Sequence, residues 1–222
     1  GYSALANNTT ADDNIAIGLN AMLANTTGTR NIAIGNTAYD ASDTENDNMA
    51  IGHVAMSLDT AGGTRNIAIG NYSLDALTSG DYNVAIGYGA AGALTTGGSN
   101  TAVGDGAMSG AAVTGDYNTA IGLNAMDALT GGSNNTSVGQ NALGAVTTGG
   151  DNTAIGKNSM LIDTTGASNT AIGIYSLRQN LGGHNNVAVG QSALLNNTTA
   201  DYNLAVGYNA AYNNTTGTRN ID

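Results

Sequence analysis

The sequence predicts an all-β repeat solenoid, a parallel β-roll of about 13 turns of 17–18 residues. Three observations lead to that fold class. A pentad, Asn-x-Ala-Ile/Val-Gly, recurs along the whole chain, and ten of its twelve intervals are 17 residues long while two are 18. Within the pentad, the residues alternate with the period of a strand. Between pentads, Thr, Asn and Gly cluster as they do in turns. Each repeat is therefore one unit stacked on similar neighbours.

The pentads define a common numbering, in which position 1 of each repeat is the Asn. The full pentads begin at Asn14, Asn31, Asn48, Asn66, Asn83, Asn100, Asn118, Asn135, Asn152, Asn169, Asn186 and Asn203, and a truncated copy begins at Asn220. Positions 2 and 4 carry Ile, Val, Leu, Met or Thr and share one face of the expected strand, whereas Asn, Ala and Gly share the other.

Two pentad positions have expected structural roles. The stacked Asn side chains can pass amide hydrogen bonds from turn to turn. The Gly fits a site of positive φ or one that another backbone approaches closely. The residues singled out for these roles, with two apolar neighbours, are Asn14, Gly18, Asn31, Gly35, Asn118, Ile121, Gly122, Asn152, Ile155 and Gly156.

After the pentad, positions 7–11 predict a second short strand, and the following Thr-Thr-Gly or Thr-Gly-Gly segment predicts the turn. Position 8 is always Ala or Ser, and position 9 is mostly Leu or Met. One helical turn at positions 6–13 is the alternative, because Ala, Leu and Met favour helices. The segment is short for a stable helix, which favours the strand.

The interior of such a coil is thin, since the chain has no Phe or Trp. Apolar burial contributes roughly 25 cal/mol per Å², and ordering each residue costs about 1.5 kcal/mol. A single coil therefore looks marginal. Either the Ile/Val column of the pentad or the Leu/Met column after it requires a partner surface, and self-association of identical coils supplies one.

Composition excludes several classes of protein. The formal charge of −11 disfavours nucleic-acid binding, and no apolar run has the roughly 20 residues of a transmembrane helix. Cysteine is absent, so a disulfide framework or thiolate metal site is excluded. We expect one solenoid over residues 1–222, without an internal boundary. Because the chain begins and ends inside repeats, we expect an uncapped excerpt of a longer fibre protein.

Residues 118–131, Asn-Thr-Ala-Ile-Gly-Leu-Asn-Ala-Met-Asp-Ala-Leu-Thr-Gly, resemble the head repeats of trimeric autotransporter adhesins. Residues 152–166 repeat the pattern with Ser159 and Ile162 in place of two alanines. The resemblance implies a left-handed parallel β-roll, three chains side by side about a three-fold axis, and binding to host surfaces or matrix proteins. The repeat is longer than the usual head repeat, and its Asn-Thr-Thr-Gly turns look like fibre repeats of phage tail proteins and large bacterial surface proteins.

A search for chemistry finds no catalytic constellation, so we expect neither an enzyme nor a cofactor. His53 and His184 lie about eight turns apart, and Gly87–Gly92 matches Gly-x-Gly-x-x-Gly without a βαβ unit. The acidic residues from Asp40 to Asp47 offer oxygen ligands for Ca²⁺, but the calcium β-roll motif is absent, so no metal site is assigned.

Candidate recognition residues precede the pentads, because exposed Tyr and Arg are frequent in binding surfaces. A structural role, shielding the edge of the turn, is the alternative. These residues are Tyr82, Tyr117, Tyr202, Arg30, Arg65 and Arg219.

The expected function is a structural and adhesive segment of an extracellular fibre, on a cell surface or a virion, that mediates attachment. Its expected partners are copies of itself and a host-cell, matrix or glycan receptor, with no nucleic acid and no membrane insertion. The alternative is a ligand-binding solenoid, such as an ice-binding or glycan-binding array. It rests on stacked threonines at position 2, which are Thr101, Thr119, Thr136, Thr153 and Thr170.

Overall fold

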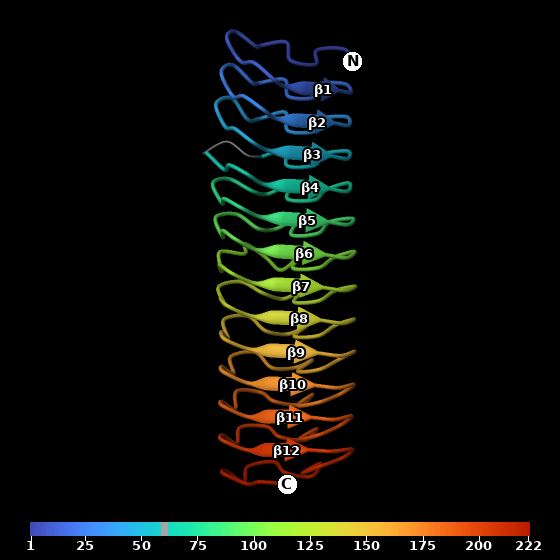
Figure 1. The fold of residues 1–222 in the computed structure, drawn as a ribbon, viewed down its shortest axis with the longest axis vertical. Helices are drawn as coiled ribbons and strands as arrows, with labels where there is room; N and C mark the ends of the chain where they lie inside the picture. The colour runs from blue at the N-terminus through green and yellow to red at the C-terminus, as the bar shows by residue number, and fades with distance from the viewer. Residues whose placement is uncertain (59–61) are drawn as a thin grey trace. The chain divides into compact units, whose positions relative to one another are not determined.

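The computed structural model describes residues 1–58 and 62–222, and the chain forms two compact units, residues 1–114 (unit 1) and 115–222 (unit 2). Every strand has three residues and comprises positions 2–4 of a pentad (Figure 1). Unit 1 contains β1 (Ile15–Ile17), β2 (Ile32–Ile34), β3 (Met49–Ile51), β4 (Ile67–Ile69), β5 (Val84–Ile86) and β6 (Thr101–Val103). Unit 2 contains β7 (Thr119–Ile121), β8 (Thr136–Val138), β9 (Thr153–Ile155), β10 (Thr170–Ile172), β11 (Val187–Val189) and β12 (Leu204–Val206).

Within each unit, consecutive strands pair in parallel and in register, so each turn of the chain places its strand beside the preceding one. In unit 1, Ala33 of β2 lies opposite Ala50 of β3. In unit 2, Thr153 of β9 lies opposite Thr170 of β10. The repeat period thus becomes the strand register, and the prediction of an all-β parallel solenoid is confirmed.

The interior of each turn is built from small residues and a few larger apolar side chains. Ala or Ser at position 3 is buried in β2 to β12, and Ala or Ser at position 8 is buried in the turns that follow these strands, apart from the last, where Ala210 is half-buried. Position 9 supplies most of the largest buried side chains, such as Met22, Met126 and Leu177, and position 12 adds Leu77, Leu94 and Leu129, all fully buried. Of the two apolar columns that the sequence offered, the Leu/Met column therefore fills the core, and the Ile/Val column faces outward.

A ladder of Asn side chains at position 1 joins the turns and closes each of them. The backbone N–H of Asn135 donates to the side-chain oxygen of Asn118 (3.0 Å), and the side-chain oxygen of Asn135 accepts from the N–H of Asn152 (3.0 Å). The Asn135 amide nitrogen donates to the carbonyl of Gly149, at the end of the same turn (2.9 Å). The predicted turn-to-turn amide bonds are confirmed, and they also satisfy backbone groups that would otherwise be buried without partners.

The pentad Gly marks the corner where the strand ends, and both predicted reasons for it hold. Gly122 has a φ of +134°, and a Cβ added there would lie 2.7 Å from the carbonyl oxygen of Gly139. Gly35 has a φ of +145°, and its Cβ would lie 2.2 Å from the carbonyl oxygen of Gly52. A side chain at this position would therefore be strained by the backbone and blocked by the adjacent turn.

The second strand predicted at positions 7–11 is wrong, and the helical alternative does not form in the described residues either. Two consecutive turns occupy this segment, closed in one repeat by bonds from Ala125 N–H to Gly122 carbonyl and from Leu129 N–H to Met126 carbonyl (3.2 Å each). Positions 7 and 9 adopt positive φ, as at Asn124 (51°) and Met126 (52°). Such residues cannot continue a strand. The chain turns here because it must return to the start of the next strand within 17 residues.

The described residues contain twelve strands, against the expected 13 turns. The segment before β1 consists of turns, and the truncated last copy contributes one isolated parallel bridge, between Leu204 and Ile221. The difference arises because a three-residue strand needs a complete pentad.

We expect Leu177→Ala to lower the free energy of unfolding by about 2–5 kcal/mol, because it leaves a cavity in the buried column. Leu181→Ala is the matched control, since Leu181 lies four residues away and is 49% exposed. Urea unfolding of the two variants tests the inward placement of position 9. Equal losses would contradict it.

We expect Asn135→Ala to lower the free energy of unfolding on the order of 3 kcal/mol, because it leaves buried backbone groups of two turns without partners. The control is Asn213→Ala, at an exposed turn residue, which should change stability by less than about 0.5 kcal/mol. Urea unfolding of the two variants tests this prediction. An Asn135→Ala variant as stable as the control would refute the stabilising role of the ladder.

Candidate functional site

The outward face of the strands is the main candidate interaction surface. We call the side chains at positions 2 and 4 the strand face. In unit 1 it comprises Ile15, Ile17, Ile32, Ile34, Met49, Ile51, Ile67, Ile69, Val84, Ile86, Thr101 and Val103. In unit 2 it comprises Thr119, Ile121, Thr136, Val138, Thr153, Ile155, Thr170, Ile172, Val187, Val189, Leu204 and Val206.

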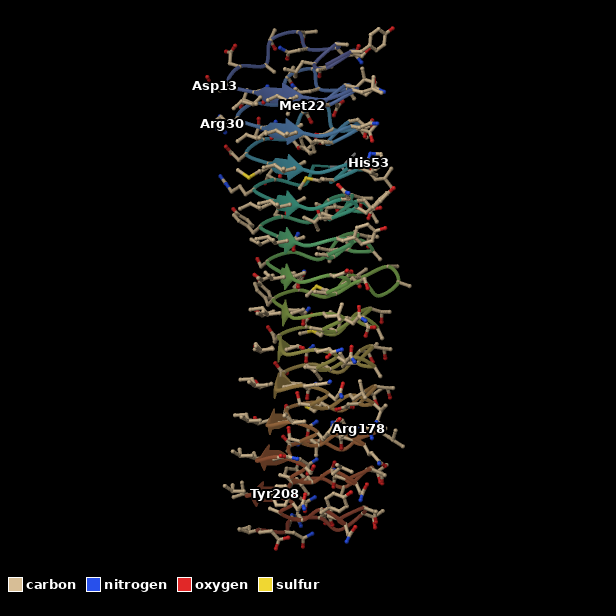
Figure 2. The ribbon with its side chains drawn as sticks, turned by 90° about the vertical axis from the view of Figure 1, so that its right-hand side faces the viewer. Asp13, Met22, Arg30, His53, Arg178 and Tyr208 are labelled. Atoms are coloured by element: carbon tan, nitrogen blue, oxygen red, sulfur yellow. The ribbon has the colours of Figure 1, made fainter. Side chains whose placement is uncertain are left out.

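These side chains project from the strands, on the left in Figure 2, and none of them is fully buried. Ile121 and Ile155, the two apolar residues singled out from the sequence, are each 39% exposed. Successive side chains of a strand point to opposite faces. Because Asn and Ala of the pentad point into the interior, the Ile and Val side chains between them point outward. The Ile and Val side chains at position 4 form a continuous apolar column in each unit, and contiguous exposed apolar surface marks sites of interaction.

Position 6, directly after the corner glycine, forms a further column of exposed side chains. Leu123 and Ile174 are each 45% exposed in unit 2, and Tyr208 is more exposed still (Figure 2). In unit 1 the same column includes Tyr88 and His53, and Tyr72 lies between them at ring-centroid distances of 5.6 and 5.4 Å. These three rings therefore form a small aromatic cluster in unit 1, and Figure 2 shows its His53 on the side opposite the strand face.

The structural residues of the pentad lie where they were expected. Asn31, Asn118 and Asn152 are buried in the ladder, and Asn14 is half-buried in the first turn. Gly18 and Gly156 have φ values of +140° and +130°, like the other corner glycines. These residues shape the coil and hold the strand face in position.

The six candidate recognition residues all occupy the last position of a repeat, directly before a pentad Asn, and the structure brings some of them together in pairs. The Arg65 guanidinium lies 5.3 Å from the ring centre of Tyr82, and that of Arg219 lies 5.8 Å from the ring centre of Tyr202. Arg30 forms an ion pair with Asp47 at 2.6 Å, and Tyr117 is 65% exposed. Each pair joins adjacent turns, so the six residues form no single site.

The acidic segment from Asp40 to Asp47 is divided among separate interactions. Glu45 is buried and accepts hydrogen bonds from the Ser42 hydroxyl and from the N–H groups of Asp43 and Thr44. The hydrogen bond from Arg30 lowers the pKa of Asp47, and burial raises the pKa of Asp40. Among the described residues, no three His, Cys, Asp or Glu side chains are arranged to hold a metal ion.

The two histidines also lie apart from any catalytic arrangement. His53 belongs to unit 1 and packs edge-on against Tyr72. His184 belongs to unit 2, where its Nδ1 accepts a hydrogen bond from the N–H of Ala167 (3.1 Å). Each therefore has a local partner in its own unit. No helix that could cross a membrane occurs in the part of the chain that the structure describes.

A buried carboxyl group, Asp163, went unnoticed in the sequence. It is fully buried at position 12, where neighbouring turns carry Asn180 and Asn197. Desolvation raises its pKa, although hydrogen bonds from the Asn180 amide (2.9 Å) and the Gly166 N–H (2.7 Å) act in the opposite direction. The signal available in the sequence was its alignment with an Asn column, which becomes informative only once position 12 is known to point inward.

We expect Asp163→Asn to stabilise the protein at neutral pH on the order of 1 kcal/mol. The raised folded-state pKa means that the charged carboxylate destabilises the fold above that pKa, and the penalty fades as the pH falls through it. An Asn can donate to the Gly166 carbonyl as Asn180 does to that of Gly183 (2.9 Å). Urea unfolding at neutral and acidic pH should show a gain that shrinks on acidification. The exposed control Asp151→Asn should show none, and a pH-independent gain would contradict the assignment.

Comparison with known proteins assigns no family to this chain. No protein-family model matches the chain, and no curated protein or solved structure matches it either.

Proposed function

We propose that this chain is a structural and adhesive segment of an extracellular fibre, on a cell surface or a virion, in which copies of the chain associate through the strand face. The outward direction of the Ile and Val side chains at positions 2 and 4 carries this proposal. A solenoid that met only water would gain by placing polar residues there, as sheets with one solvated face do. The segment acts by assembly and presentation, without catalysis or a cofactor.

The free energy gained by burying the strand face is large enough to support association. Complete burial of a Val or Ile side chain contributes about 1.5–3 kcal/mol, and the strand-face residues are already half-buried. If each regains on the order of 0.5 kcal/mol, a column pair over six strands contributes roughly 6 kcal/mol per unit. That is of the same order as the association cost of about 4–15 kcal/mol.

The partner that fits this surface best is a second copy of the chain. The strand face carries no charged residue, although the chain has a net charge of −11. Contact through this face therefore keeps the acidic turns of the copies apart, and it offers no complementary charge to a basic or acidic partner. Two copies also share one axial repeat of about 4.8 Å, so their ladders match turn for turn.

Three copies follow from the resemblance to adhesin head repeats, where three β-rolls pack about a three-fold axis. Three-fold packing places every copy in the same environment and closes the assembly, so no strand face is left exposed. Side chains outside the strand face then remain free to meet a host-cell, matrix or glycan receptor. Attachment is the proposed role of the assembled fibre.

We expect the wild-type protein to have about three times the chain mass of 21.9 kDa in light scattering coupled to size exclusion. The double variant Ile121→Asp with Ile155→Asp should run as a monomer, because buried unpaired carboxylates would oppose the contact. Circular dichroism should show that it remains folded.

The matched control is Thr148→Asp with Thr165→Asp, which adds the same two charges at exposed turn positions. It should keep the wild-type mass. A monomeric wild type would overturn the assembly, and dissociation of the control alone would place the interface on the turns.

The in-register threonines of unit 2 favour a second candidate function, an ice-binding surface. Thr119, Thr136, Thr153 and Thr170 lie side by side on β7 to β10, facing outward next to the Ile/Val column. A flat, repeated array of hydroxyl and methyl groups suits an ordered water lattice. Strong inhibition of ice recrystallisation by a monomeric protein would favour this function over the fibre.

A further inference from the structure

Unit 2 contains a shallow cavity of about 360 Å³ on the turns that follow β10, β11 and β12. Its wall comes from three consecutive turns, and the labelled Arg178 projects on the side opposite the strand face in Figure 2. The cavity is lined by Tyr175, Arg178, Gln179, Leu195, Asn196 and Tyr212.

Arg178 is the only charged residue of this lining, and it is held in place by Tyr175. Its guanidinium carbon lies 5.7 Å from the centre of the Tyr175 ring, a geometry in which ring and cation attract each other. Its Nε is shielded from solvent and has no hydrogen-bond partner among the described residues. A shielded donor without a partner is unfavourable, so this guanidinium has hydrogen-bonding capacity that the described residues do not use.

The charge of the cavity selects the kind of acceptor. No acidic residue lines it, in a chain with 16 Asp and Glu against 5 Lys and Arg. A carboxylate fits a planar guanidinium through two parallel hydrogen bonds. The cavity is thus a local cationic spot on an acidic protein.

The remaining side chains suit a sugar ring that carries this carboxylate. Tyr175 and Tyr212 offer apolar ring faces with polar hydroxyl tips, and Leu195 adds apolar surface. The amides of Gln179 and Asn196 provide donors and acceptors for ring hydroxyls. A few convergent polar groups on an apolar, aromatic lining are typical of small-ligand sites.

We propose that this cavity binds a uronic acid residue of an acidic polysaccharide. The carboxylate accepts hydrogen bonds from Arg178, the sugar ring lies against a tyrosine, and the two amides contact its hydroxyls. All six lining residues come from one chain, so this binding does not depend on the association of copies. It would give the fibre a receptor of defined chemistry.

Two of the lining residues occupy the same position of the repeat. Arg178 and Tyr212 are 34 residues apart, which is two repeats of 17, and both occupy position 10. Neither the repeat pattern nor the motif search selected them, because position 10 varies from Leu to Asp to Gly along the chain.

Isothermal titration calorimetry with tri-galacturonate, and with the matched galactose trisaccharide that lacks carboxylates, tests the proposal. The wild-type protein should bind the acidic trisaccharide at least tenfold more tightly than the neutral one. Arg178→Gln should remove this preference, and Tyr212→Ala should weaken the binding of tri-galacturonate.

The control is Arg219→Gln, which removes an arginine held over Tyr202 at 5.8 Å, outside the cavity. It should bind like the wild type, and thermal unfolding should show all variants folded. Failure of the wild type to bind tri-galacturonate, equal binding of the two trisaccharides, or unchanged binding by Arg178→Gln would each overturn the proposal. None of these results bears on the mass of the assembly, so the two proposals fail separately.

Discussion

The Asn ladder at position 1 is the interaction on which the rest of the structure depends. Each Asn connects two turns through its side-chain oxygen and closes its own turn through its side-chain nitrogen, as Asn169 does with Asn152, Gly183 and Asn186. Because the interior is narrow, water does not reach these backbone groups, and the Asn side chains are their hydrogen-bond partners. The ladder therefore fixes which face of the pentad points inward, and the outward direction of Ile and Val is its consequence.

The outward apolar columns explain why so thin a coil carries so much Ile and Val. Ala or Ser at positions 3 and 8, the larger side chains at position 9 and the buried residues at position 12 occupy the interior, and larger residues at positions 3 and 8 would exceed its volume. The apolar residues that would form a core in a globular domain therefore lie on the surface. Their complete burial requires another molecule, and in the proposed fibre this is a second copy of the chain with the same axial repeat.

The repeats differ from one another at some positions and are nearly constant at others. Positions 1, 3, 5 and 8 hardly change, because each is in contact with its equivalent in the next turn. Positions 6, 10 and 17 point away from the core and change freely, from Asp105 to Tyr208 at position 6. A solenoid can thus acquire a local site, such as the one around Arg178, without any change in its scaffold, since the scaffold residues and the site residues are different sets.

The sequence by itself determined the period, the strand in each pentad, the parallel register and the roles of Asn and Gly, because identical turns force identical residues into contact. It left open which apolar column is buried, and its second strand was wrong. Positive φ at positions such as Asn124 and Met126, which returns the chain for the next turn, depends on closure of the whole coil. The tertiary structure alone decided the buried Asp163 and the cavity at Arg178, because both arise between turns whose contacting positions are known only once the coil is closed.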